Sequence, residues 1–142
     1  MGETTRRTPD LSLRDTFLRA AASLPGEDER AGVVGEALEY LQRGFDAHYA
    51  GRGANDDDIL VGDNAYALAV ETIARLDEPR FVAVAGRMIR DGAGRIAEGG
   101  VVTVEMWTPH LAGLLDIISR EGAERSEARI KAAAEELRGA SG

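Results

Sequence analysis

Apolar residues recur three and four positions apart along almost the whole chain, which is the spacing of one face of an α-helix. One stretch departs from this pattern: the β-branched residues in "GGVVTVEMW" favour a strand, but a single strand has nothing to pair with. We interpret this stretch as a continuation of the preceding helix past Gly99 and Gly100. The sequence therefore predicts an all-α fold, a helical bundle of about six helices.

Glycine, proline and capping residues mark the ends of the predicted helices. Asp63 is placed to cap the third helix, Pro79 to lie in the first turn of the fourth, and Thr108 with Pro109 to open the fifth, which Gly122 closes. The predicted helices cover residues 11–24, 29 to about 51, 64–76, 79–97 with its continuation past Gly99 and Gly100, 108–122 and 123–137. We expect one helical domain over residues 11–138, with flexible ends at 1–10 and 139–142.

Size and charge exclude several classes of protein. The 142 residues suffice for one core, and 25 acidic against 17 basic residues give a net charge of −8, which repels nucleic acid. Without cysteine there is no disulfide, thiolate nucleophile or thiolate metal site. The start "MGETTRRTPD" lacks the apolar core of a signal peptide, and no run approaches the ~20 apolar residues of a membrane span. We expect a soluble, cytoplasmic protein.

Four aspartates within eight residues, in "DDDILVGD", are the strongest candidate site. Asp57, Asp58 and Asp63 could hold Mg²⁺, or the stretch could be a solvated loop that ends at Asp63 as the helix cap. On a regular helix, positions five or six apart diverge by about 120° or more, so a metal site would need a distorted helix end. We therefore favour the loop and predict no catalytic residue and no resident cofactor, with Mg²⁺ as the alternative.

Two other groups of side chains have metal-binding chemistry. His48 and His110 are the only histidines, and we interpret both as surface or partly buried residues. Asp46, Glu98 and Glu105 could form a carboxylate cluster across facing helices, but the Glu-x-x-His pair typical of di-metal bundles is missing.

The stretch "ILVGDNAYALAVETIARLDEPRFVAVAGRMIRDGAGRIAEG" resembles the polyprenyl synthetase (trans-isoprenyl diphosphate synthase) family. Residues 60–63 correspond to the family's "LLGD", residues 66–69 to its aromatic and alanine positions, residues 76–79 to its turn, and residues 97–99 to the end of its next helix. The two helices before this stretch also resemble the family, so the similarity covers roughly residues 13–103. It implies half of an isoprenoid-synthase-like fold.

The resemblance also implies what catalysis would require. Family enzymes clamp Mg²⁺ between a diphosphate and two aspartate-rich motifs. At the first motif this chain keeps only Asp46, the second would lie beyond residue 142, and Lys131, the only lysine, is in the last helix. The chain is thus similar to the small, non-catalytic subunit of heterodimeric long-chain prenyl diphosphate synthases. The alternatives are a small helical homodimer that binds an isoprenoid or other apolar ligand, and a Mg²⁺-dependent prenyltransferase that uses Asp57, Asp58 and Asp63.

In the family, the helix that opens with "LLGD" and the following helix form much of the dimer interface. The resemblance therefore implies a partner, either a second copy of this chain or a larger prenyl diphosphate synthase subunit. The residues expected at the interface are Ala65, Leu68, Ala69, Thr72, Ile73, Ala85, Met88 and Ile89.

Overall fold

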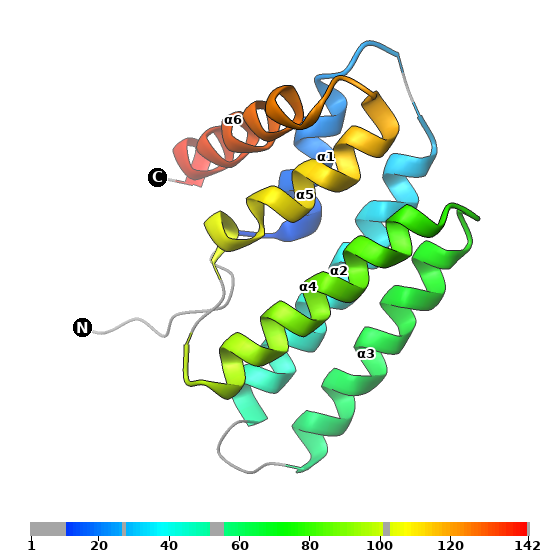
Figure 1. Cartoon of the computed structure of the whole chain (residues 1–142). Helices are drawn as coiled ribbons and strands as arrows, with labels where there is room; N and C mark the ends of the chain where they lie inside the picture. The colour runs from blue at the N-terminus through cyan, green and yellow to red at the C-terminus, as the bar shows by residue number, and fades with distance from the viewer. Residues whose placement is uncertain (1–10, 27, 52–55, 101–102, 142) are drawn as a thin grey trace.

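A computed structural model describes residues 11–26, 28–51, 56–100 and 103–141, and in these ranges the chain forms six helices and no strand (Figure 1). The helices are α1 (Leu13–Ala22), α2 (Arg30–Gly51), α3 (Asp56–Ala74), α4 (Pro79–Ala97), α5 (Val104–Ser119) and α6 (Ala123–Ser141). The predicted all-α fold of about six helices is confirmed. None of the described helices is long and apolar enough to cross a membrane.

The third helix begins earlier than the sequence indicated. It starts at Asp56 rather than Asn64, so Asp63 lies inside the helix and the prediction that it caps α3 is wrong. Aspartates occupy the first three positions of α3, where negative charge complements the partial positive charge of a helix N-terminus. Gly62, the residue before Asp63, is buried in mid-helix against α2.

The connection between α4 and α5 also differs from the prediction. Helix α4 ends at Ala97 and does not continue through Gly99, whose φ of +86° is incompatible with a right-handed helix. Thr103, not Thr108, caps α5 by accepting a hydrogen bond from the Met106 N–H, so Pro109 lies within the helix. At the other end of the chain, α6 extends to Ser141, so residues 139–141 continue that helix. The predicted flexible N-terminus, residues 1–10, lies outside the described residues.

Two groups of helices form the bundle. Helices α2, α3 and α4 lie side by side, and α1, α5 and α6 gather next to them (Figure 1). Helix α2 belongs to both groups because it also packs against α1 and α5. Within the described part of the chain, α3 contacts only α2 and α4, so it forms an outer edge of the bundle with one side uncovered.

The core contains four aromatic side chains that are fully buried and come from different helices: Phe17 of α1, Phe45 of α2, Phe81 of α4 and Trp107 of α5. Phe45 and Trp107 stack with their ring centroids 5.0 Å apart and their planes 12° from parallel. Gly92 of α4 faces this stack, and the absence of a Cβ there lets α4 pack directly on the two rings.

Most of the residues expected at a dimer interface lie in this core instead. Ala65, Ala69, Thr72, Ile73, Ala85 and Met88 are buried against other helices of the same chain. Leu68 and Ile89 are half-buried. These six residues therefore pack within one molecule, and a second chain could not reach them without separating the helices.

We expect Gly92→Ala to lower the free energy of unfolding by about 1–3 kcal/mol, because the new methyl group would overlap the Phe45 ring and lie 2.9 Å from Cη2 of Trp107. Gly86→Ala is the matched control on the same helix, since a Cβ there would meet no described atom within 4 Å. The control should gain up to ~1 kcal/mol from helix propensity. Urea denaturation measures both, and equal stability of the two variants would contradict the packing described.

Candidate functional site

The contact between α2 and α3 contains a hydrogen-bonded chain of three polar side chains, Asp63, His48 and Tyr66. His48 Nε2 lies 3.0 Å from Asp63 Oδ1, and His48 Nδ1 lies 3.2 Å from the Tyr66 hydroxyl. A carboxylate can only accept, so Nε2–H donates to Asp63, and in the neutral imidazole Nδ1 then accepts from the tyrosine O–H. The order carboxylate, imidazole, hydroxyl is the one found in proton relays.

Two glycines make room for these rings. Gly44 lies one turn before His48 on α2, and a Cβ there would overlap the Tyr66 ring. Gly62 lies one turn before Tyr66 on α3, and a Cβ there would overlap the His48 ring and come within 3.1 Å of the Gly44 carbonyl oxygen. Each helix thus receives an aromatic side chain of the other, and the two rings meet edge to face, 4.8 Å between centroids.

The hydroxyl of this chain is not available for chemistry. Tyr66 is only 7% exposed. Burial, and secondarily the charge of Asp63, raises the pKa of the Tyr66 phenol well above its usual range. At neutral pH the group is a buried hydrogen-bond donor, neither a phenolate nor within reach of a substrate. The arrangement therefore fixes α3 on α2.

The aspartates of "DDDILVGD" all belong to helix α3. Asp57 is exposed, while Asp63, six positions further, is bonded to His48. The side chain of Asp58 lies outside the described residues, so the predicted magnesium site of Asp57, Asp58 and Asp63 stays a prediction. Among the residues that the structure describes, no three carboxylates or imidazoles are grouped so that they could hold a metal ion.

The second histidine also bonds to a carboxylate. His110 Nε2 of α5 lies 3.1 Å from Asp91 Oδ2 of α4, next to the Trp107 ring. Both histidines are partly buried, as the sequence indicated. Glu105, proposed as a member of a carboxylate cluster, is instead paired with Arg138 of α6 at 2.6 Å.

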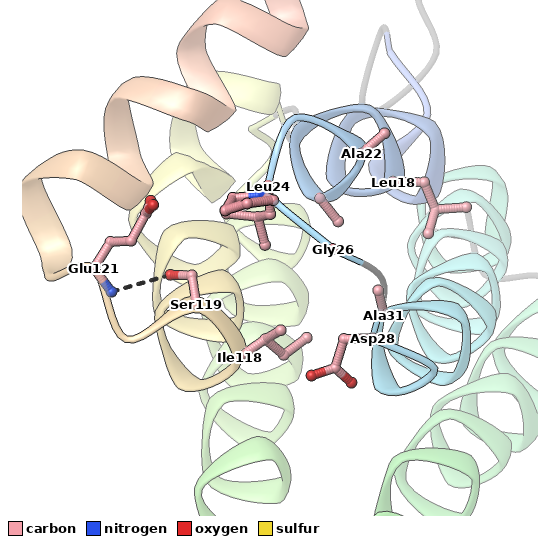
Figure 2. Close-up of a pocket in the computed structure, with 11 residues that line it drawn as sticks. Leu18, Ala22, Leu24, Gly26, Asp28, Ala31, Ile118, Ser119 and Glu121 are labelled. Atoms are coloured by element: carbon pink, nitrogen blue, oxygen red, sulfur yellow. Dashed lines mark hydrogen bonds between the residues drawn. The ribbon is translucent and has the colours of Figure 1, made fainter.

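A pocket of about 510 Å³ lies at the end of the bundle where α1 and α5 finish and α2 begins (Figure 2). Sequence reasoning missed it because its walls come from segments about ninety residues apart. Its lining residues are Leu18, Ala21, Ala22, Leu24, Pro25, Gly26, Asp28, Ala31, Ile118, Ser119 and Glu121.

Each carboxylate of this pocket is held by an arginine. Arg30 binds Asp28 with Nη2 2.8 Å from Oδ2, and Arg129 binds Glu121 through two nitrogens at 2.7 and 2.9 Å. These bonds lower the pKa of both carboxyl groups, so both are ionised at neutral pH. Arg129 also donates to the carbonyl and hydroxyl oxygens of Ser23 at the end of α1, which ties α6 to α1.

The uncovered side of α3 carries the third feature, an apolar patch formed by Ile59, Leu60 and Val61. These side chains are 40%, 68% and 57% exposed, and they are the only large apolar residues exposed in the described part of the chain. The signal for the patch was present in "DDDILVGD", where three apolar residues follow the aspartates without a gap.

No protein-family model, no curated protein and no solved structure matches this chain.

We expect Tyr66→Phe to lower the free energy of unfolding by about 0.5–1.5 kcal/mol at neutral pH, because the hydrogen bond to His48 Nδ1 is lost. The raised pKa of Tyr66 means that above pH ~10 only the unfolded chain loses this proton. Above this pH the free energy of unfolding of the wild-type protein falls by up to ~1.4 kcal/mol per pH unit, and that of the variant lacks this decrease. Urea denaturation between pH 8 and 11 should show a constant stability difference below pH 9 that narrows above 10. A difference that is unchanged at pH 11 would show that the phenol titrates normally in the fold.

Proposed function

We propose that this chain is a non-catalytic helical protein that acts by binding another protein through the outer faces of α3 and α4. The observation that carries the proposal is the exposed patch of Ile59, Leu60 and Val61. Burying a Leu or Val side chain is worth about 1.5–3 kcal/mol, so this patch is a source of binding energy that the monomer leaves unused. Contiguous apolar exposure of this kind marks interaction sites.

The outer face of α4 suits a close helix contact. Gly86 and Gly94 lie on it eight positions apart, and a Cβ at either would meet no described atom within 4 Å. Ala83, which is also exposed, lies on the same side of the helix. Small residues on an uncovered helix face allow another backbone to approach.

The two outer faces also carry opposite charges. Exposed acidic residues on α3 include Asp57, Asp63 and Glu71, and exposed arginines on α4 include Arg87 and Arg90. If α3 of one molecule packs on α4 of another, the charges pair favourably, which steers association and sets its orientation. A two-fold dimer makes this contact twice.

This surface is the opposite side of the helices that the sequence predicted for association. The resemblance to polyprenyl synthetases supplies the class of partner, a second copy or a larger, catalytic prenyl diphosphate synthase subunit. The side chains that would make the contact differ from those expected, because six of the eight expected residues are buried in the chain's own core.

The native mass, measured by light scattering over a hundredfold range of concentration, tests the association. We expect a mass that rises towards twice 15.2 kDa. The double variant Leu60→Asp/Val61→Asp should stay monomeric, because the charges would be buried in the contact. Both residues are exposed, so the fold should keep its stability. Ala132→Asp, on the exposed side of α6, is the control and should associate like the wild type. If the double variant associates as the wild type does, this surface does not mediate the association and the proposal is wrong.

The absence of catalysis is tested by incubating the purified chain with Mg²⁺ and allylic plus homoallylic diphosphates. We expect no prenyl diphosphate longer than the substrates, because the family's diphosphate-binding lysine has no match here: Lys131, the only lysine, pairs with Glu127 on α6. A product that disappears in the variant Asp57→Ala/Asp58→Ala would overturn the proposal in favour of a Mg²⁺-dependent prenyltransferase.

A further inference from the structure

We propose that the partner of the outer faces of α3 and α4 is a second copy of this chain, with α3 of each copy antiparallel to α4 of the other. This inference rests on the proposed function and adds the partner, its orientation and its register. The two-fold axis runs parallel to the helices, so α3 and α4 of the two copies form a group of four in which neighbouring helices are antiparallel.

Charge is divided between the two helices. Helix α3 contains five acidic residues and no basic one, and α4 contains four arginines and one aspartate. Two copies of α3 would therefore repel each other, whereas α3 of one copy attracts α4 of another. A face that carries an acidic and a basic helix side by side is complementary to itself under a two-fold axis.

Some of these charges find little use within the chain. Glu71 of α3 and Arg87 of α4 are exposed, and neither is paired with another described residue. Arg90 is also exposed and reaches only Asp91, the next residue, with 4.0 Å between Nε and Oδ1. Glu71, Arg87 and Arg90 can therefore pair with a second copy without breaking a bond to another helix.

The acidic and basic residues lie at matching heights along the helices. Helices α3 and α4 lie side by side and are joined by residues 75–78 (Figure 1), so residues equally far from this turn are at about the same height. Asp63 is 12 positions before residue 75, and Arg90 is 12 positions after residue 78. Rotation about an axis parallel to the helices keeps heights, so Asp63 of one copy lies level with Arg90 of the other. The Asp63 side chain is 63% exposed although His48 bonds to one of its oxygens, so it can accept a further bond.

The apolar patch meets small residues of α4 in this register. Leu60 is 15 positions before the turn and Gly94 is 16 positions after it. The side chain of Leu60 leans towards the start of α3 and thus towards the height of Gly94. A Cβ at Gly94 would meet no described atom within 4 Å, so the α4 backbone is open to the Leu60 side chain there. The opposite orientation, with α3 parallel to α4 of the other copy, would place Leu60 beside Ala83, because both are the fifth residue of their helix. It would also align the helix dipoles unfavourably.

Single cysteines test the orientation, because the native chain has none. Ala74, Ala83 and Ala97 are exposed on the outer faces and lie outside the apolar patch. A mixture of Ala74→Cys and Ala83→Cys chains should give a disulfide between the two chains on mild oxidation, since both positions lie near the turn. A mixture of Ala74→Cys and Ala97→Cys chains should give at least about tenfold less, because these positions lie at opposite ends of the helices. Peptide mass spectrometry identifies the linked positions. A more abundant link between 74 and 97, or no link in either mixture, would overturn the inference.

Reversed charges test the contact between α3 and α4. The variants Arg87→Glu/Arg90→Glu on α4 and Asn64→Arg/Ala67→Arg on α3 change only exposed residues at matching heights. Each variant alone should associate at least about tenfold more weakly than the wild type, because like charges then face each other. An equimolar mixture should recover association to within about threefold of the wild type, since the reversed α4 of one chain faces the reversed α3 of the other. Recovery also shows that both variants fold. No recovery, or full association of either variant alone, would overturn the contact.

Failure of this inference can be told apart from failure of the proposed function. If Leu60→Asp/Val61→Asp associates as the wild type does, the surface itself is wrong. If that variant stays monomeric but the cysteine links or the charge reversals disagree with the register, only the arrangement of the two copies is wrong. A wild-type chain that stays monomeric at every concentration would overturn the second copy as partner and leave a different protein as the occupant of this surface.

Discussion

The close contact between α2 and α3 is the constraint on which the rest of this structure depends. It exists because Gly44 and Gly62 each leave a space that a ring of the other helix fills, Tyr66 in the first and His48 in the second. With the two backbones so close, the hydroxyl of Tyr66 reaches the imidazole, and the imidazole reaches Asp63. Phe45, one position after Gly44, is then held between Tyr66 and Trp107, and through it α5 is placed on the α2–α3 pair.

The same contact explains why the sequence predicted the number of helices correctly but misplaced several ends. The periodic spacing of apolar residues is a local property of the sequence, and it indicated each of the helices. Gly62 and Asp63 have the local character of a helix start, yet here the glycine is required by a ring 14 positions earlier in the chain, and the aspartate bonds to that ring. Thr108 and Pro109 also have the local character of a helix start, but Thr103 caps the helix five residues before. Local signals cannot rank two possible caps when tertiary packing decides between them.

The candidate sites show a similar division between local and tertiary information. The aspartates were evident in the sequence, but the sequence favoured a loop there, whereas helix α3 runs from Asp56 onward. The hydrogen-bonded chain was not predictable, since nothing in the sequence places His48 against Asp63. The pocket was even less predictable from the sequence, because its apolar wall and its carboxylates come from α1, the start of α2 and the end of α5. Small apolar residues on α3 and α4 indicated close packing correctly, but composition does not say whether the neighbouring helix belongs to the same molecule.

Helices α2 and α5 both line the pocket, and they pack against α3 and α4, which carry the association surface. Ala31 in the first turns of α2 lines the pocket, and His48 near the end of α2 holds α3, about 25 Å away along the helix axis. A ligand in the pocket changes association at α3 only if it binds the associated form with a different affinity from the free form. A rigid α2 gives no such difference, because neither its backbone nor the bond between His48 and Asp63 needs to move when the pocket fills. The pocket and the association surface should therefore act independently unless binding shifts α2 or α5 as a whole. In α2, the Gly44–Tyr66 and Gly62–His48 contacts are where such a shift would act first.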